Sequence, residues 1–283
     1  MGRKRDLVSR VASRLARPVE VITKGGREKY QNSPRLAILM FHHITKTVST
    51  NDDRDLTVST ENFRKCCELF KEHFRIVTFK EAKKILDEQR ARIINRDEKE
   101  KKPLMVFSFD DGYTDFYENA VPIMREFGIK SNQNIVVRFA DENREGYMNW
   151  EQIRELHKSG LVELGCHTYD KHYFKNGKAV IETLRKDEIL EDLIRAKESF
   201  ERELDYVPEV VAWPYGVAPI NISVKELNGL GLVYALNTES GINYSPVDFA
   251  SLKRFAVLDY EGPEKTLDII RGYDDLGFLL KKY

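Results

Sequence analysis

The chain has 283 residues, 41% of them hydrophobic, so it can bury one large core or two smaller ones. Its 46 basic and 46 acidic residues cancel, and net charge therefore gives no reason to expect a nucleic-acid partner. Three cysteines, two of them adjacent at Cys66 and Cys67, are too few for a disulfide framework and favour a reducing compartment.

The first 30 residues differ from the rest, because they hold nine basic and three acidic residues. Residues 1–18 predict a helix with Leu7, Val8, Val11 and Leu15 on one stripe. This helix either lies on an anionic membrane surface or packs on the flank of the protein. Residues 1–25 lack the apolar core of a signal peptide, so we expect a cytoplasmic protein, peripheral at the inner membrane surface if the helix binds lipid.

From about residue 35 onward, apolar runs alternate with segments of helical period. Strands are predicted at residues 36–41, 75–79, 104–107, 134–139, 161–166, 207–213, 232–237 and 252–258. Helices are predicted at residues 60–74, 80–89, 115–127, 150–159, 185–204, 224–230 and within 263–281. This alternation predicts an α/β fold, an irregular (β/α) barrel of about seven to eight strands. A doubly wound open sheet is the structural alternative.

Polar side chains directly follow four of the predicted strands. They are His42 and His43, Asp110 and Asp111, His167, and the turn at residues 213–216. In a barrel the carboxyl ends of parallel strands meet on one face, where active sites are built. We therefore expect these four groups to converge.

The buried run at residues 104–107 leads into Asp110, Asp111 and Gly112. Adjacent side chains diverge, so one carboxylate can bind a metal while the other stays free as a base. Gly112 allows the backbone to turn sharply beneath them. Taken alone, the three residues more often form a simple turn that leaves a strand, and the histidines downstream favour the functional interpretation.

His167 and His172 are five residues apart, a spacing that turns the two rings away from each other on a regular helix. In a loop or at a helix start both can face one ion. With one aspartate they form the two-His, one-Asp set of catalytic zinc, which leaves a position for water. Non-haem iron uses a similar triad, so the ligands alone do not choose the metal. Loop histidines unrelated to metal are the alternative.

Three motifs, Phe109-Asp110-Asp111-Gly112, His167-Thr168-x-x-x-His172 and Trp213-Pro214-Tyr215-Gly216, resemble those of the polysaccharide deacetylase family with NodB homology, carbohydrate esterase family four. Residues 39–44 and 149–153 resemble its poly-N-acetylglucosamine deacetylase branch. The resemblance covers about residues 36–258. It implies a NodB-like catalytic domain at residues 35–283, after a basic extension at residues 1–34. It also implies metal-dependent removal of acetyl from an N-acetylated amino sugar in a polysaccharide, oligosaccharide or glycoconjugate.

Carried over by this resemblance, Asp111, His167 and His172 would bind a divalent metal, usually zinc in the family. Asp110 would be the general base, and the backbone N–H of Tyr215 would stabilise the oxyanion. The leaving amine needs a proton donor, and many members use a late histidine, but no histidine follows His172 here. In the poly-N-acetylglucosamine branch the early histidine takes that role. We therefore expect His42 as the acid, with His43 facing outward as the fallback.

Other residues complete the expected site. Ala212 stands where many members have arginine, and Arg254 either holds Asp110 or, as we expect, makes a surface salt bridge. The expected substrate-binding residues are Trp213, Pro214, Tyr113 and His43, whereas Trp150 is expected in the core and Cys166 outside the metal shell. The missing arginine and late histidine leave open a glycan-binding protein without turnover. Another metal-dependent amide hydrolase on the same barrel is a third alternative.

Overall fold

The computed structural model describes residues 35–49, 53–94 and 102–271. The predicted N-terminal helix and the basic extension at residues 1–34 lie outside the described residues, as does the chain beyond residue 271. Within the described part of the chain, no helix has both the length and the apolar composition needed to cross a bilayer.

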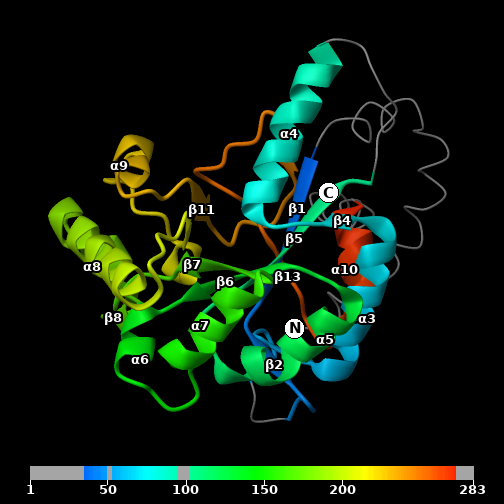
Figure 1. Ribbon diagram of the computed structural model, residues 1–283, viewed down its shortest axis with the longest axis horizontal. Coiled ribbons are helices and arrows are strands. Elements are labelled where there is room, and N and C mark those ends of the chain that lie inside the picture. Colours follow the sequence, from blue (N-terminus) through cyan, green and yellow to red (C-terminus); the bar gives the residue numbers. More distant parts are fainter. Residues whose placement is uncertain (1–34, 50–52, 95–101, 272–283) are drawn as a thin grey trace, which may run out of the picture.

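One curled sheet with helices packed around it organises the mixed α/β fold (Figure 1). Its path runs β11–β10–β7–β6–β5–β1–β12, and β13 and β4 pair with β1 and β5. The bounds are β1 (Arg35–Phe41), β4 (Arg75–Ile76), β5 (Leu104–Phe109), β6 (Ser131–Ile135), β7 (Val162–Cys166), β10 (Val210–Ala212), β11 (Tyr234–Leu236), β12 (Asn243–Tyr244) and β13 (Phe255–Ala256). All neighbours are parallel except β1 and β12.

The segment around β13 joins the two sides of the sheet. Leu252 forms a parallel bridge to Leu236 in β11, and Phe255 pairs with Leu39 in β1. The sheet therefore curls into a half-barrel whose sides meet across this segment. The prediction of an irregular barrel of seven to eight strands is confirmed, and the open doubly wound sheet is wrong.

The helices that surround the sheet are α3 (Thr60–His73), α4 (Phe79–Ile94), α5 (Val121–Phe127), α6 (Val137–Asp141), α7 (Trp150–Ser159), α8 (Lys186–Leu204), α9 (Val224–Gly229) and α10 (Gly262–Ile270). Two short pairs lie outside the main sheet, namely β2 (His43–Thr45) with β3 (Thr57–Ser59), and β8 (Phe174–Lys175) with β9 (Lys178–Ala179). The predicted helix at residues 115–127 is a π-helical turn (Phe116–Ala120) followed by α5. Pro122 accounts for this change, because it lies in the first turn of α5, where no N–H is needed.

Alternation along the strands divides the inside of the barrel into an apolar half and a polar half. Leu36, Ile38, Leu104, Val106 and Val210 form part of an apolar cluster with Phe79 and Leu86 of α4. Further along β5 the same alternation brings Ser108 and then Asp110 to that inner face. The polar half thus lies at the carboxyl ends of the strands.

The strand predicted at residues 134–139 was placed wrongly. The structure has β6 at Ser131–Ile135 and the short helix α6 from Val137. This strand begins with four successive polar residues, Ser-Asn-Gln-Asn, which do not give the apolar pattern expected of a buried strand. All four are nevertheless buried. They are polar because the neighbouring strand ends form a polar network.

Candidate metal and catalytic site

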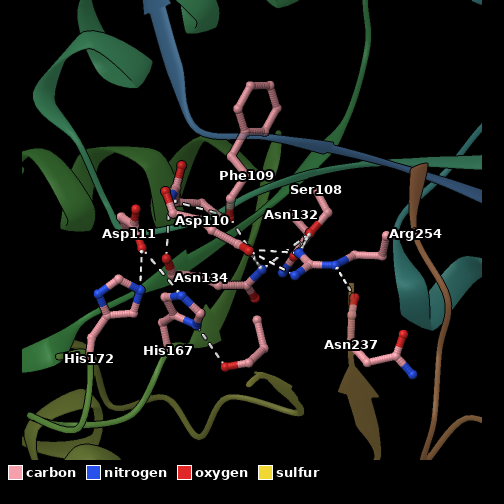
Figure 2. Close-up of polar contacts among 12 residues, drawn as sticks. Ser108, Phe109, Asp110, Asp111, Asn132, Asn134, His167, His172, Asn237 and Arg254 are labelled. Atoms are coloured by element: carbon pink, nitrogen blue, oxygen red, sulfur yellow. Dashed lines mark hydrogen bonds and ion pairs between the residues drawn. The ribbon is translucent and has the colours of Figure 1, made fainter. Parts of the chain in front are cut away.

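Asp111, His167 and His172 lie together at the carboxyl ends of β5 and β7. Asp111 Oδ1 lies 3.2 Å from Nε2 of His167 and 3.2 Å from Nε2 of His172 (Figure 2). The three side chains offer ligand atoms that all lie within 4.8 Å of one another. His167 and His172, 56 and 61 positions after Asp111, thus present two imidazoles to its carboxylate, as the position of these residues at predicted strand ends indicated.

The backbone at this point is held in unusual conformations. Asp111, Thr168 and Tyr215 have positive φ angles of 73°, 68° and 56°. Such a φ is unfavourable for residues with a side chain, most of all for β-branched Thr168, and clusters at functional sites. Gly112 also has a positive φ of 84°, which its lack of a Cβ allows.

The surroundings of the three side chains fit a cation. His167 Nδ1 donates to the carbonyl of Ala212 at 2.7 Å, so in the neutral ring Nε2 is an acceptor that faces the Asp111 carboxylate. Among the residues that the structure describes, Asp111 Oδ1 has no hydrogen-bond partner although it is buried. Two acceptors face each other stably only with a positive charge between them. Two imidazoles and one carboxylate are the donor set of catalytic zinc sites.

The pKa values of these groups reflect the same crowding. Burial opposes ionisation of Asp111, but the neighbouring imidazoles outweigh it and lower the pKa of this carboxyl to about 2. For His167 burial is likewise outweighed, in this case by the Asp111 and Asp110 carboxylates, so its pKa is raised. Burial and the nearby His167 lower the pKa of His172 to about 4. Asp111 is thus anionic and His172 neutral near pH 7, the states in which both residues bind a metal.

Asp110 has a separate set of partners on the inner face of the barrel (Figure 2). Its Oδ1 accepts hydrogen bonds from Asn134 Nδ2 at 2.8 Å and from Arg254 Nη1 at 2.9 Å, while Arg254 Nη2 lies 2.8 Å from Oδ2. Burial alone would raise the pKa of Asp110, but the Arg254 guanidinium and His167 hold it well below its usual range. Asp110 is therefore an ionised carboxylate that does not share the cation site.

Arg254 corrects one expectation. We expected a surface salt bridge, but Arg254 is 1% exposed and pairs with Asp110, and its Nε donates to the carbonyl of Asn237 at 2.8 Å. The reason is that Arg254 lies on the segment that joins the two sides of the sheet, two residues after Leu252, and points inward. Ala212, directly before the third motif, offers its backbone carbonyl to His167 Nδ1.

The two early histidines lie in different environments. His42 follows β1 and is half-buried; burial lowers its pKa, although the Asp110 and Asp111 carboxylates oppose this shift. His43 Nδ1 lies 2.5 Å from Asp115 Oδ2, and its ring stacks on Tyr113 at 3.6 Å. His43 is partly exposed and is held by these two partners, and its outward facing stays a prediction. The strand ends at Phe41, so its alternation does not extend to His43.

Aromatic rings line two sides of the site. On one side Tyr215 stacks on His172 with centroids 4.7 Å apart, and Phe174 packs on Tyr215 at 4.2 Å. On the other side Tyr113 stacks on Tyr147 at 4.9 Å. Tyr147 and Phe174 carried no signal in the sequence, because only the folded loops bring them beside the motifs.

The third motif turns its tryptophan away from the surface. Trp213 is 2% exposed and Pro214 is also buried, so neither offers a face to a sugar ring, and the expectation that they contact substrate is corrected. Trp213 lies on the core side because β10 continues its alternation through Ala212 into the turn. Trp150 packs in the core as expected, and its Nε1 donates to Asp141 at 2.8 Å.

Two further residues hold the site and had no signal in the sequence. Asn134 donates to Asp110, as described above. Asp192 of α8 is buried and accepts the backbone N–H of Tyr169 at 2.8 Å and of Asp170 at 3.1 Å, inside the loop between the two histidine ligands. Burial raises the pKa of Asp192 to about 6, against these backbone donors and Lys171.

Comparison with known proteins identifies the class. Residues 97–235 match the family model described as polysaccharide deacetylase. The family resemblance of the motifs is thereby confirmed.

Relatives and solved structures narrow the comparison. The poly-beta-1,6-N-acetyl-D-glucosamine N-deacetylase of Escherichia coli (strain K12) is 29% identical over 223 residues, which covers 61% of this chain and 33% of that protein. The protein of the same name from Staphylococcus aureus (strain MRSA252) is 28% identical over 138 residues and covers 47% of each chain. The chain therefore spans a third to a half of the length of these relatives.

Two solved structures share the fold. The Streptococcus pyogenes deacetylase PplD in complex with acetate superposes with a TM-score of 0.67 at 21% identity, covering 83% of this chain and 97% of that one. IcaB from Ammonifex degensii gives a TM-score of 0.67 at 23% identity with the same coverage. The half-barrel sheet is thus the fold of known deacetylases.

Proposed function

We propose that the protein is a metal-dependent N-deacetylase that acts on N-acetylated amino sugars of a poly-N-acetylglucosamine type of glycan or glycoconjugate. The observation that carries this proposal is the side-by-side placement of a two-His, one-Asp ligand set and a second, separately tethered carboxylate. The substrate class is supported by the names of the Escherichia coli and Staphylococcus aureus relatives.

In this proposal Asp111, His167 and His172 hold the metal, and their donor set favours zinc. A divalent ion bound there supplies Lewis-acid polarisation of the acetamide carbonyl and lowers the pKa of water. His167 is fixed as a ligand by its Nδ1 bond to Ala212, which leaves Nε2 for the ion.

The protein's own groups move the protons. Asp110 is ionised and accepts a proton from the attacking water while the new C–O bond forms. The backbone N–H of Tyr215 donates to the oxyanion that develops on the former carbonyl oxygen. His42 gives a proton to the sugar nitrogen as the C–N bond breaks, and the products are acetate and a free amine.

A glycan-binding protein without turnover is the competing proposal, and it rested on the missing arginine and late histidine. Arg254 supplies a buried guanidinium to Asp110 from another part of the chain, and His42 supplies an imidazole near both aspartates. The features whose absence suggested an inactive protein are therefore replaced, which supports the enzyme.

The direct test is acetate release from a panel of N-acetylglucosamine oligomers, with and without a metal chelator. We expect release that the chelator abolishes and that added zinc restores. Metal binding without acetate release from any acetylated sugar would instead support the glycan-binding protein. Release that a chelator does not affect would point to a metal-independent hydrolase.

The basic N-terminus supports a second, separate proposal. Nine basic and three acidic residues among residues 1–30 favour contact with an anionic membrane surface, in the cytoplasm, from which a lipid-linked glycan would be reached. Removal of residues 1–30 should reduce binding to phosphatidylserine vesicles at low salt. Full-length protein that ignores such vesicles would contradict this proposal.

A further inference from the structure

The central strand β6 carries polar residues where a barrel strand is usually apolar. Asn132, Gln133 and Asn134 are all 0% exposed. Burying three amides in succession is unfavourable unless hydrogen bonds compensate. The alternation of the strand sends Asn132 and Asn134 to the inner face with Ser108 and Asp110, and sends Gln133 to the other face.

Asn134 is oriented by the charge of Asp110. Its Nδ2 donates to Asp110 Oδ1 at 2.8 Å and lies 3.2 Å from both Ser108 Oγ and the Phe109 carbonyl. The reverse orientation of the amide would point its oxygen at a carboxylate. Among the described residues, Asn134 Oδ1 accepts no hydrogen bond, although it is buried. Nδ2 thus makes three hydrogen bonds, the shortest of them to an ionised carboxylate, while the amide oxygen stays unsatisfied.

Gly165 of β7 leaves the space that this orientation needs. It lies opposite Asn134 in the register of the two strands. A Cβ at Gly165 would lie 2.1 Å from Asn134 Oδ1 and 3.1 Å from Asn132 Nδ2. Gly165 is therefore required by the close approach of the Asn134 side chain. Any larger residue would push the amide away from its place against Asp110.

We propose that Asn134, in the space left by Gly165, is a positioning residue that sets which oxygen of Asp110 works as the base. Oδ1 accepts from two donors, Asn134 Nδ2 and Arg254 Nη1, whereas among the described residues the one group paired with Oδ2 is Arg254 Nη2. Oδ2 therefore keeps more lone-pair capacity and is the atom that takes the proton from water. This inference rests on the proposed function.

The test is a double-mutant cycle between Asn134→Ala and Gly165→Ala in the metal-loaded protein. Asn134→Ala should lower kcat for acetate release by about ten- to a hundred-fold, the effect of losing a hydrogen bond to a charged group, with KM and metal content unchanged. Gly165→Ala should lower kcat similarly, because it displaces the amide. In the double variant the second substitution should add little to the loss of kcat, because alanine at residue 134 removes the nearest atom, at 2.1 Å, and leaves the 3.1 Å contacts with Asn132 Nδ2 and Val210 Cβ.

The matched control is Gln133→Ala, on the same strand and equally buried, whose amide bonds backbone carbonyls and does not touch the Asp110 carboxylate. If Asn134 has only a structural role, Asn134→Ala and Gln133→Ala should both lower the thermal stability and leave kcat per folded molecule unchanged. That result, or independent multiplicative losses in the cycle, would overturn the proposal.

A measurement without turnover separates this inference from the proposed function. The side-chain amide protons of Asn134 should exchange slowly with solvent in the wild type and faster in Asp110→Ala, while Gln133→Ala leaves them unchanged. If the wild type releases no acetate from any glycan, the proposed deacetylase fails, and with it the assignment of Oδ2 as the base. If the exchange rate of the Asn134 amide protons is unchanged in Asp110→Ala, the hydrogen bond between Asn134 and Asp110 does not position either side chain, whatever the activity.

Discussion

Asp110 and Asp111 are neighbours in sequence, and their surroundings give them opposite tasks. Asp110 continues the inward alternation of β5 and meets a guanidinium and an amide. Asp111 lies in a left-handed turn with φ of 73°, which directs its carboxylate to two imidazoles. The backbone turn thus separates a base from a ligand within one dipeptide.

Substitution of each aspartate should produce a different loss. Asp111→Ala removes the only carboxylate of the ligand set, so bound metal and acetate release should disappear together. Asp110→Asn should keep the metal and lower kcat by about 10²-fold or more, the usual effect of removing a general base. Metal content by atomic absorption and acetate release check both. Full metal occupancy in Asp111→Ala would contradict the ligand assignment.

His42 gives a pH prediction. A general acid works in its protonated form, so activity is present below its pKa and falls as the pH rises through it. Because burial lowers the pKa of His42, the alkaline limb of the kcat profile should begin at lower pH than an ordinary imidazole would give. His42→Ala should flatten that limb and slow turnover, with metal content unchanged. The pH–rate profiles of the two proteins check this.

His43 is the matched control for this experiment. Its ring is held by Asp115 and Tyr113, so His43→Ala should chiefly weaken substrate binding or stability and leave the alkaline limb in place. If His43→Ala removes the limb and His42→Ala does not, the acid has been assigned to the wrong imidazole.

At the scale of elements, α8 holds the metal-binding loop in shape. The loop contains Thr168 in a left-handed conformation with φ of 68°, which a free loop would not keep. Asp192 accepts the two N–H groups that follow Thr168 and is itself 6% exposed. Asp192 of α8 thus holds the backbone between His167 and His172.

Asp192→Asn should therefore weaken metal binding, although residue 192 is not one of the ligands. An asparagine side chain has one acceptor oxygen in place of two, so one of the backbone N–H groups of Tyr169 and Asp170 loses its partner. We expect about a ten-fold rise in the metal dissociation constant, the range found when a group behind a ligand is changed. Competition with a chromogenic chelator measures it. Unchanged affinity would show that the loop holds its shape alone.

The sequence predicted those parts of the site that depend on strand ends and spacing. The two aspartates and the two histidines followed from apolar runs that stop at polar residues, and alternation correctly implied a shared face. The prediction from sequence failed where tertiary contacts outweigh the local pattern of polar and apolar residues. The position of β6 is predicted wrongly because its polar residues face a buried network. Trp213 is predicted to bind substrate, although it packs in the core.

Arg254 shows the same limit, since nothing near it in sequence indicates burial. A lone arginine in Leu252-Lys253-Arg254-Phe255 is typical of a solvated side chain. Only closure of the barrel brings it within 2.9 Å of Asp110, 144 residues earlier in the chain. The partner of a buried charge is a property of the assembled fold.

For the whole molecule, this pair couples closure of the barrel to the active site. The segment of Leu252 and Phe255 contacts β11 on one side and β1 on the other, and Arg254 between them neutralises the carboxylate at the end of β5. Closure is therefore accompanied by the pairing of two charges that are each buried. Loss of either partner leaves the other charge buried and uncompensated.

Arg254→Met should lower the free energy of unfolding by about 3–5 kcal/mol, the cost of leaving one member of a buried ion pair alone. Without the guanidinium, burial would shift the pKa of Asp110 upward from its wild-type value, against the opposing effect of His167 and His42. The folded variant then binds the proton more tightly than the folded wild type, so its stability relative to the wild type should fall as the pH rises through the acidic range. Urea unfolding of chelator-treated protein between pH 5 and pH 8 measures both effects.

The double variant Arg254→Met with Asp110→Asn identifies the cause. It removes both charges and keeps similar volumes, so it should recover most of the lost stability and lose the pH dependence, yet remain inactive without its base. If the double variant is as unstable as Arg254→Met alone, the arginine stabilises the barrel through its bond to Asn237 and its packing. The charge of Asp110 would then have no part in closing the fold.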